Sequence, residues 1–373
     1  MHAVSTTAAN TSSAKGPDGR TIVTHVQRLA PSSSEITSTV EKDYFWQVIL
    51  NYWRLPSHIH HFPGANPMSI EKKDFTRLSA DDFLAALKTD GVRHLLLMTT
   101  KPNSNDPITI MVDRAKRMYE IEVWANEDFF QTGSLYDSEL VWEQDSLVLI
   151  VFDVILAKGV PCTHLSYRER MQILHNTILC VSESHSDESV ENMISEECKF
   201  LARNNDHNLH IIPKKCVSKA SLRSLWSDRL QSKHRNDGIV FTLNSASVDT
   251  GTSTSILKWK PSHSIDVRFE LNGNAWLMYA NMNNSSGFVR VEEACRDFTV
   301  EVAPSKLLDA IRTRQPCIVE CIINISNETL ILVPERERTD KTAPNTVKTV
   351  EATIRNAREN ISSDDLIEIV NST

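Results

Sequence analysis

The chain has 373 residues, of which 40% are hydrophobic and 24% charged, and its formal net charge is −8 at pH 7. The length suits two domains, and the composition is that of an ordinary soluble globular protein. No apolar run is long enough to span a bilayer, and the negative charge argues against a surface that coats nucleic acid, but it leaves room for a basic cleft around one nucleotide or one RNA end.

The first half of the chain mixes helical and strand-like patterns. Residues 1–20 are rich in Ser, Thr, Ala and Gly and are expected to form a disordered tail rather than a signal peptide. Residues 81–87 suit a short helix that ends just before Lys88. Further helices are expected at 166–180, 187–203 and 219–231, and strands at 93–98, 108–112, 118–124 and 147–153.

The second half changes texture near Pro261, where a domain boundary is expected. Strands at 238–243 and 255–260 precede it. Short strands separated by turns follow it, as in a small β-barrel, at 265–271, 275–280, 287–291, 317–324 and 329–333. Apolar residues recur at helical spacing from Val347 to Ala357, and Ser362 with Asp365 predicts the cap of a last helix ending near Val370.

The seven cysteines include no CxxC pair and are odd in number. This pattern predicts neither a disulfide framework nor a zinc site, so a reducing compartment is expected. The sequence also contains neither GxGxxG nor GxxxxGK[ST], which disfavours a Rossmann cofactor site and a P-loop.

The most informative segment is Lys88-Thr89-Asp90-Gly91, followed by Arg93 and an apolar strand-like run. A lysine can act as a nucleophile when its ammonium loses its proton, and nearby cations and burial lower its pKa. Taken alone, however, such a short segment is better explained as a surface turn.

Carboxylates recur at three later points along the chain. Asp137 and Glu139 could accept hydrogen bonds from ribose hydroxyls, Phe152-Asp153 ends a buried strand with a ring able to stack on a base, and Asp237 precedes a turn glycine. Asp237 could bind a divalent ion directly or through water. Each segment alone is also typical of a turn or of a core strand.

Two basic segments complete the set. In Lys258-Trp259-Lys260, strand alternation places the two lysines on one face, as a phosphate clamp that would also depress the pKa of a nearby lysine. The run from Arg336 to Lys341 follows the predicted barrel and by itself would be a solvated loop.

In order, KTDGVR, YDSEL, LIVFD, NDGIVF, ILKWKP and RERTDK resemble the collinear motifs of covalent nucleotidyltransferases, which are the mRNA capping guanylyltransferases and the ATP-dependent polynucleotide ligases. KWKP and the late RxDK favour the capping branch. The segments FPGANPMSIEKKDF and DRAKRMY and the tail from Arg338 to Val370 are similar to the compact guanylyltransferases of large algal DNA viruses.

The resemblance implies an α+β fold of two domains. Residues 21–261 would form a nucleotidyltransferase domain with antiparallel sheets, and residues 262–360 an OB-fold lid. Residues 361–373 would form a C-terminal helix able to pack on the first domain.

The resemblance also implies roles around the nucleoside. Lys88 would accept GMP, and Phe152 would stack on guanine. Lys214 or its neighbour Lys215 would read the guanine O6. The ribose would be contacted by Arg93, Arg114 and Glu139. The family's third motif usually reads Asp-Gly-Glu; Ser138 takes the place of that glycine here and puts the ribose contact of Glu139 in doubt.

The remaining implied roles concern phosphates and metal. Asp237 would serve Mg²⁺ or Mn²⁺, directly or through water, and Lys258 and Lys260 would hold the α-phosphate. The β- and γ-phosphates would be oriented by Arg338 and Lys341, supported by Asp340.

The implied activity is transfer of GMP from GTP, through a lysyl–GMP intermediate, to the 5′-diphosphate end of RNA. Because the sequence has neither an HCxxxxxR loop nor a methyltransferase glycine motif, a separate RNA triphosphatase and cap methyltransferase are expected as partners, together with a contact to RNA polymerase. No membrane partner is expected, and the location would be the nucleus or a viral replication site. Two alternatives remain open at this point, an ATP-dependent polynucleotide ligase and a catalytically inactive capping scaffold.

Overall fold

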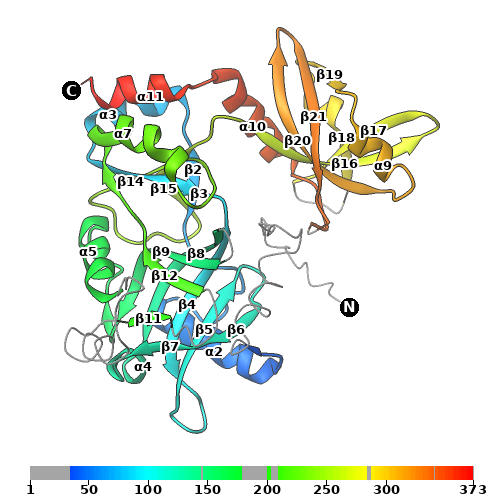
Figure 1. Cartoon of the computed structure of the whole chain (residues 1–373). Coiled ribbons are helices and arrows are strands. Elements are labelled where there is room, and N and C mark those ends of the chain that lie inside the picture. Colours follow the sequence, from blue (N-terminus) through cyan, green and yellow to red (C-terminus); the bar gives the residue numbers. More distant parts are fainter. Residues whose placement is uncertain are drawn as a thin grey trace. The chain divides into compact units, whose positions relative to one another are not determined.

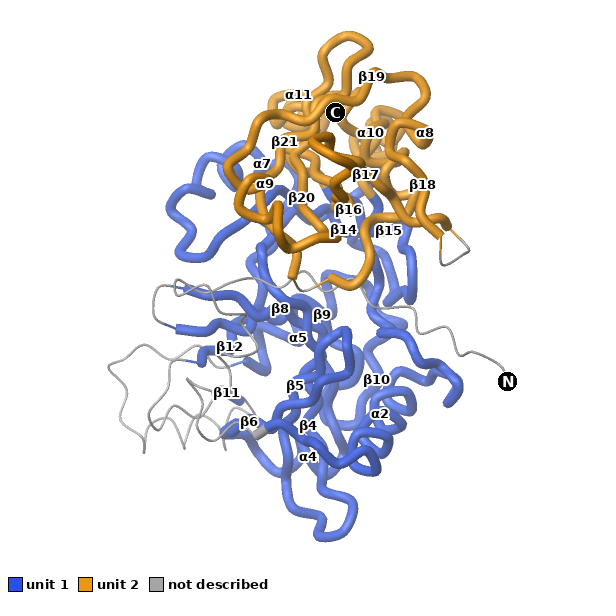
Figure 2. Tube along the Cα trace, turned by 90° about the vertical axis from the view of Figure 1, so that its right-hand side faces the viewer, with its two compact units in different colours: residues 1–68, 81–258 blue, residues 69–80, 259–373 orange. Residues whose placement is uncertain are grey.

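The structure is a computed structural model that describes residues 34–143, 146–178, 200–202, 209–283, 287–339 and 341–372. The chain divides into two compact units (Figure 2). The first comprises residues 1–68 and 81–258, and the second comprises residues 69–80 and 259–373. The expected tail, residues 1–20, lies outside the described residues. No helix in the described ranges is long and apolar enough to cross a membrane.

An eight-stranded sheet forms the larger part of the first unit (Figure 1). Its order is β1-β6-β5-β4-β8-β9-β10, with β12 pairing in parallel with β9. The strands are β1 (Ser34–Glu35), β4 (Val92–Thr100), β5 (Pro107–Asp113), β6 (Met118–Ile121), β8 (Ser134–Glu143), β9 (Ser146–Ala157), β10 (Val160–Pro161) and β12 (Leu209–Pro213).

Both faces of this sheet are buried, which explains the unbroken apolar run in β4. Leu95 and Leu97 pack on one face with helix α2 (Thr39–Trp53), whereas Leu96 and Met98 belong to the core on the other face. Alternate residues of a strand point to opposite faces, so a strand covered on both sides must be apolar throughout. The second core also includes residues of α4 (Asp128–Gln131) and α5 (Tyr167–Thr177).

A five-stranded sheet, ordered β13-β3-β14-β15-β2, carries the lysine of the KTDG segment. Its strands are β2 (Asn66–Ser69), β3 (Phe83–Thr89), β13 (Val217–Ser218), β14 (Asn236–Leu243) and β15 (Thr252–Trp259). The expected helix at 81–87 is therefore wrong. Leu, Ala and Lys favour a helix locally, but pairing of β3 with both β13 and β14 overrides that preference.

Most other expected elements of the first unit are confirmed. The 166–180 helix is α5, and the 219–231 helix is a chain of short helical segments, η2 (Lys219–Ser221), α7 (Leu222–Ser227) and η3 (Asp228–Gln231). Of the helix expected at 187–203, residues 187–199 lie outside the described ranges. Phe200–Ala202 form strand β11, which pairs with β7 (Val123–Ala125).

The second unit is built on a six-stranded sheet with the order β18-β17-β16-β20-β21-β19. Its strands are β16 (Ser264–Asn272), β17 (Ala275–Asn281), β18 (Phe288–Arg290), β19 (Thr299–Val302), β20 (Cys317–Ser326) and β21 (Thr329–Glu337). The helices are α8 (Val291–Ala294), α9 (Lys306–Ile311) and α10 (Val347–Glu359), and α10 buries Val350 and Ile354 in the core. The predicted α+β class with antiparallel sheets is confirmed, while the name OB-fold stays a prediction.

The last helix, α11 (Ser363–Val370), begins with the predicted cap, since Ser362 and Asp365 exchange hydrogen bonds in a capping box. It packs on α3 (Phe75–Ala80), which follows the helical turn η1 (Lys72–Asp74) in the same unit. Trp259 Nε1 donates to the Ile361 carbonyl at 2.8 Å and fixes the start of this region. The expected domain limits stay a prediction.

Candidate active site

Lys88 is held by a carboxylate that a bulge in the neighbouring strand presents to it. Asn236 pairs with Thr89 and Ile239 with Leu87, so Asp237 and Gly238 together face the single residue Lys88. Such a bulge bends the strand and re-aims its side chains. Lys88 Nζ donates to Asp237 Oδ1 at 2.7 Å, and 21% and 30% of the two side chains are exposed. The site thus joins a partly exposed lysine to a partly exposed acid.

The expected lowering of the Lys88 pKa is wrong for this structure. Burial alone lowers the pKa of the amine, but the charges of Asp237, Glu139 and Asp90 outweigh it, so the pKa lies above the usual lysine value. The expected lowering relied on the cations Lys258 and Lys260, which the sequence shows. The three carboxylates that act on the amine come together only in the folded chain. The lysine is therefore held as an ammonium ion.

A chain of hydrogen bonds runs beside the Lys88–Asp237 pair. Lys214 Nζ donates to Thr89 Oγ1 at 2.9 Å, and Thr89 Oγ1 donates to Glu139 Oε2 at 2.5 Å. Lys215 is exposed whereas Lys214 is half-buried and bonded to Thr89, so the geometry favours Lys214 of the Lys214–Lys215 pair. Burial, together with the Lys88 charge, lowers the pKa of Lys214 despite Glu139. Thr89 was not among the predicted site residues, although it lies inside the KTDG segment.

The turn before β4 has room only for a glycine at position 91. A Cβ at this position would lie 2.5 Å from the Leu140 carbonyl oxygen and 2.8 Å from Glu139 Cγ. Any side chain would therefore displace β8 and the carboxylate that Thr89 binds. The glycine allows the turn to approach Glu139 closely.

Arg93 forms the centre of a second cluster in the same unit. Its Nε and Nη2 donate to the two carboxylate oxygens of Asp137 at 2.9 and 2.5 Å, and Nη1 donates to the Ala65 carbonyl at 2.5 Å. Its guanidinium lies 5.4 Å from the ring centre of Phe62 and 5.3 Å from that of Phe152. This bidentate pair and the two rings fix Arg93 in one orientation.

Arg114 joins this cluster through the turn-rich loop before β2. Its Nη2 donates to Asn66 Oδ1 at 3.2 Å, and its guanidinium lies 5.8 Å from the Phe62 ring. Burial and the charge of Arg93 lower the pKa of Arg114 to about 10, so it stays protonated at neutral pH. The sequence analysis did not assign Phe62 or Asn66 a role, although both lie in the FPGANP segment that it quoted.

Phe152 occupies a bulge in β9. Asp137 pairs with Asp153 and Ser138 with Val151, which leaves Phe152 without a partner across the ladder. Its ring is half-buried and faces the Arg93 guanidinium. A strand-ending aromatic was expected here, but β9 continues to Ala157.

Ser138, the departure from the usual glycine, fits the strand without strain. It lies in β8, is not among the residues with positive φ, and is fully buried. Its hydroxyl donates to the His94 carbonyl at 2.8 Å, which joins β8 to β4 beside Glu139.

The two lysines of KWKP divide between the units. Lys258 lies in β15, the neighbour of the β14 strand that carries Asp237. The strand ends at Trp259, and Lys260 belongs to the second unit. The expected shared strand face therefore extends only to Lys258.

In the second unit, the cations of the last block share one buried carboxylate. Arg338 Nη1 donates to Asp266 Oδ1 at 2.9 Å, and Lys341 Nζ donates to Asp266 Oδ2. Only 6% of the Arg338 side chain and 7% of that of Asp266 are exposed. Asp340 lies outside the described residues. Asp266 was not among the predicted site residues. The one indication of its role in the sequence is that it is an acid flanked by apolar residues in a predicted strand.

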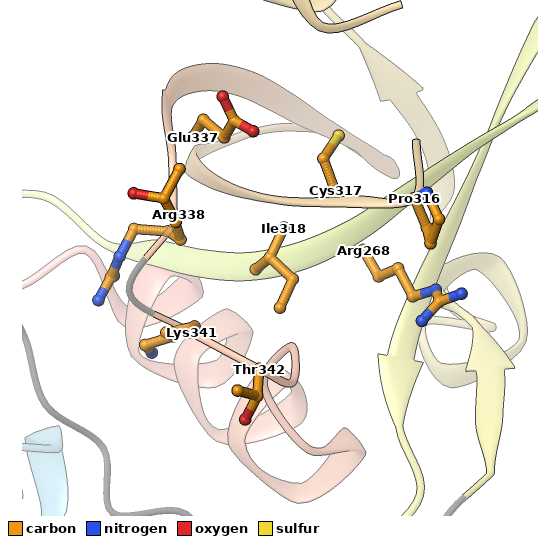
Figure 3. A pocket seen from close by; sticks show the side chains of 9 residues that line it. Arg268, Pro316, Cys317, Ile318, Glu337, Arg338, Lys341 and Thr342 are labelled. Carbon is orange, nitrogen blue, oxygen red and sulfur yellow. The ribbon is translucent and has the colours of Figure 1, made fainter. Parts of the chain in front are cut away.

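Arg338 and Lys341 also line a cavity of about 220 Å³ together with Arg268 and Cys317 (Figure 3). The Arg268 guanidinium is paired with Glu270 at 2.5 Å. Each of these three cations thus has an acidic partner within the unit.

The donor set around Lys88 suits a hard divalent cation only in part. Among the described residues, no group of three His, Cys, Asp or Glu side chains is placed to hold a metal ion. Asp237 offers an accessible carboxylate, and Mg²⁺ commonly binds one or two carboxylates, completing its shell with water and substrate phosphates. Asp237 therefore fits a metal that arrives with the nucleotide.

Comparison with known proteins shows the family to which the chain belongs. The family described as mRNA capping enzyme, catalytic domain, matches residues 29–262, and the one described as mRNA capping enzyme, C-terminal domain, matches residues 247–367. The chain belongs to the mRNA capping enzyme family. It is an mRNA guanylyltransferase, a nucleotidyltransferase.

The sequence identity with individual relatives is low, but the matches cover most of this chain. The mRNA-capping enzyme subunit alpha of Schizosaccharomyces pombe is 24% identical over 82% of this chain and 79% of its own length. The mRNA-capping enzyme of Caenorhabditis elegans is 22% identical over 83% of this chain, which spans about half (49%) of that protein. A solved mycobacterial DNA ligase D is 12% identical over 74% of this chain and 94% of its own, with a TM-score of 0.39.

Proposed function

We propose that this guanylyltransferase forms its covalent intermediate on Lys88 and passes GMP to the 5′-diphosphate end of RNA. The observation that carries the proposal is the accessible Lys88 amine held at Asp237, beside the Lys214–Thr89–Glu139 chain. An amine, an acid and a set of hydrogen-bonding groups at one strand end are what nucleophilic attack on a nucleotide requires.

In the first step, Lys88 Nζ attacks the α-phosphorus of GTP. The N–P bond forms while the bond from phosphorus to the bridging oxygen breaks, and pyrophosphate leaves. The ammonium must lose a proton before it attacks, and Asp237 Oδ1, at 2.7 Å, is placed to accept it. In the second step, a terminal phosphate oxygen of the RNA attacks phosphorus, the N–P bond breaks, and Lys88 Nζ takes up a proton.

The nucleoside would be held by the clusters around Arg93. Phe152 would stack on guanine, and its ring has Arg93 on one side, so base binding must share or displace that contact. Lys214 would exchange its bond to Thr89 for the guanine O6. Arg93, Arg114 and Glu139 would serve the ribose, with Arg93 already oriented by Asp137.

The phosphates would be met by four cations of the predicted site. Lys258 and Lys260 would hold the α-phosphate, and Arg338 and Lys341 the leaving β- and γ-phosphates. Because Asp266 now accepts from Arg338 and Lys341, phosphate oxygens must replace that carboxylate. The role of Asp340 as a support remains part of the proposal.

Asp237 would hold Mg²⁺ or Mn²⁺ directly or through water, and the ion would screen phosphate charge when bound. The proposed partners are GTP, the RNA end, a separate RNA triphosphatase, a separate cap methyltransferase and RNA polymerase. The place of action would be the nucleus or a viral replication site.

The test is incubation with α-labelled GTP or ATP and a divalent cation, followed by denaturing electrophoresis and mass mapping of the labelled peptide. We expect label from GTP, on the peptide that contains Lys88. Label from ATP alone, or on another lysine, would overturn the proposal. An absence of label with any nucleotide would indicate an inactive scaffold.

A further inference from the structure

Hydrogen bonds and an ion pair hold the segment around Phe152 at three consecutive residues. The Val151 carbonyl accepts from the Lys214 backbone N–H at 2.7 Å, and the Phe152 carbonyl accepts from the Tyr167 hydroxyl at 3.2 Å. The Asp153 carboxylate binds Arg170. A bulged residue has no ladder partner of its own, so contacts from outside the strand decide its direction.

Arg170 is the strongest of these fastenings. Its Nε and Nη2 donate to the two oxygens of Asp153 at 2.6 and 3.1 Å, and its Nη1 donates to the carbonyls of Leu165 and Ala246. Its side chain is 2% exposed. A buried guanidinium with charge-assisted bonds to both oxygens of one acid leaves that acid a single orientation.

Tyr167 connects the bulge to the segment that follows β12. Its hydroxyl lies 3.2 Å from the Phe152 carbonyl oxygen and 3.5 Å from Cys216 Sγ. Cys216 is two residues beyond Lys214, the residue proposed to read the guanine O6. The hydroxyl therefore bridges the two segments that would meet the base.

Helix α5 supplies both residues from its first turns, and its own start is fixed. Ser166 and Glu169 form a capping box, and the Tyr167 backbone N–H donates to the Asn244 carbonyl at 2.9 Å. The helix is thus a rigid support from which two side chains reach β9.

We propose that Tyr167 and Arg170 are positioning residues for base recognition, which hold the β9 bulge so that Phe152 and Lys214 meet the guanine together. This inference rests on the proposed roles of Phe152 and Lys214. Neither residue need touch the nucleotide, and both act through groups that would.

The test uses Tyr167→Phe, which removes only the hydroxyl and keeps the buried ring. Loss of the hydroxyl contacts with the Phe152 carbonyl and Cys216 Sγ should raise the KM for GTP by about fivefold. It should also reduce the preference for GTP over ATP in covalent labelling, while inhibition by tripolyphosphate, which has no base, stays unchanged. Arg170→Lys should act in the same direction and more strongly, because one ammonium cannot replace the fork.

Arg168→Gln is the matched control, since Arg168 lies on the same helix turn with 58% of its side chain exposed. It should leave the KM for GTP and the GTP preference unchanged. If Tyr167→Phe lowers only the melting temperature and leaves KM and nucleotide preference at wild-type values, the positioning role is wrong. Weaker inhibition of Tyr167→Phe by tripolyphosphate would also overturn the positioning role, because the defect would then not be specific to the base.

Phe152→Ala separates this inference from the function on which it rests. A wild-type KM for GTP in Phe152→Ala would remove the proposed stacking role itself. If Phe152→Ala raises the KM and Tyr167→Phe does not, stacking stands and positioning fails. If both raise it, the effects in the double variant should be less than additive, since part of the effect of the hydroxyl passes through the Phe152 ring and part through the Lys214 segment; full additivity would contradict the proposal.

Discussion

Around Lys88 and around Arg338, cations and carboxylates meet in two different ways. Lys88 and Asp237 are 21% and 30% exposed, and neither side chain is enclosed. Arg338 and Asp266 are only 6% and 7% exposed, and Lys341 shares the same carboxylate. The first pair can part with both groups still partly exposed to water, whereas separation of the second needs another anion to take the place of Asp266. This difference supports the proposal that the covalent step takes place at Lys88. It also supports the proposal that phosphate oxygens replace Asp266 at Arg338 and Lys341.

The largest expected effect is loss of the nucleophile. Lys88→Arg keeps the charge beside Asp237 but cannot supply a neutral amine, because guanidinium stays protonated. Covalent labelling with GTP should fall to background, as measured by gel counting. Lys101→Arg, an exposed lysine paired with Glu120, should label normally. Label on Lys88→Arg at a wild-type level would assign the nucleophile elsewhere.

Substitution of the two KWKP lysines tests whether both of them bind the α-phosphate. Lys258→Ala and Lys260→Ala should each slow lysyl–GMP formation by about 100-fold, since each removes one phosphate donor. Single-turnover rates with excess enzyme measure the effect. Rates within a few-fold of wild type for both variants would remove the clamp. A defect in Lys258→Ala alone would confine α-phosphate binding to the first unit.

The buried cations should matter for one half-reaction only. Arg338→Ala or Lys341→Ala should slow formation of lysyl–GMP by about 100-fold, because pyrophosphate leaves in that step. Transfer of GMP from the pre-formed intermediate to diphosphate RNA should be nearly unchanged, since pyrophosphate is absent there. Intermediate loaded by prolonged incubation allows each half-reaction to be timed. Equal defects in both would mean that the block acts on folding or RNA.

The carboxylates around Lys88 predict a pH dependence of labelling. The pKa of Lys88 is raised and the amine must be neutral to attack, so the rate should rise with pH through the neutral range by about tenfold per unit. Asp237→Asn removes the largest raising influence and should move the rate profile to lower pH, and it should also lower the maximal rate because it removes the carboxylate proposed to accept the proton. Asp90→Asn removes a smaller one and should move it less. An unshifted profile in both variants would show that another group controls the rate.

The smallest expected effect concerns the departure in the third motif. Ser138→Gly removes the buried hydrogen bond to His94 and places a flexible residue in β8, which should cost about 1–2 kcal/mol of unfolding free energy. Denaturant unfolding measures this. Labelling at saturating GTP should be unchanged, because Glu139 remains bound to Thr89. A large gain in labelling would instead show that the serine disturbs Glu139.

The sequence alone determined most strands and helices and the identity of the lysine and the acid that meet in the first unit, while its domain limits stay a prediction. It could do so because strand periodicity, caps and the ordered motifs are local properties of the chain. Four features were decided only by tertiary structure. Pairing on both sides made Phe83–Thr89 a strand despite its helical residues. Packing placed three carboxylates around Lys88 and so reversed the expected pKa shift. The fastening of the Phe152 bulge by α5, and the burial of Asp266 beneath Arg338 and Lys341, join residues far apart in sequence, where no local pattern records the contact.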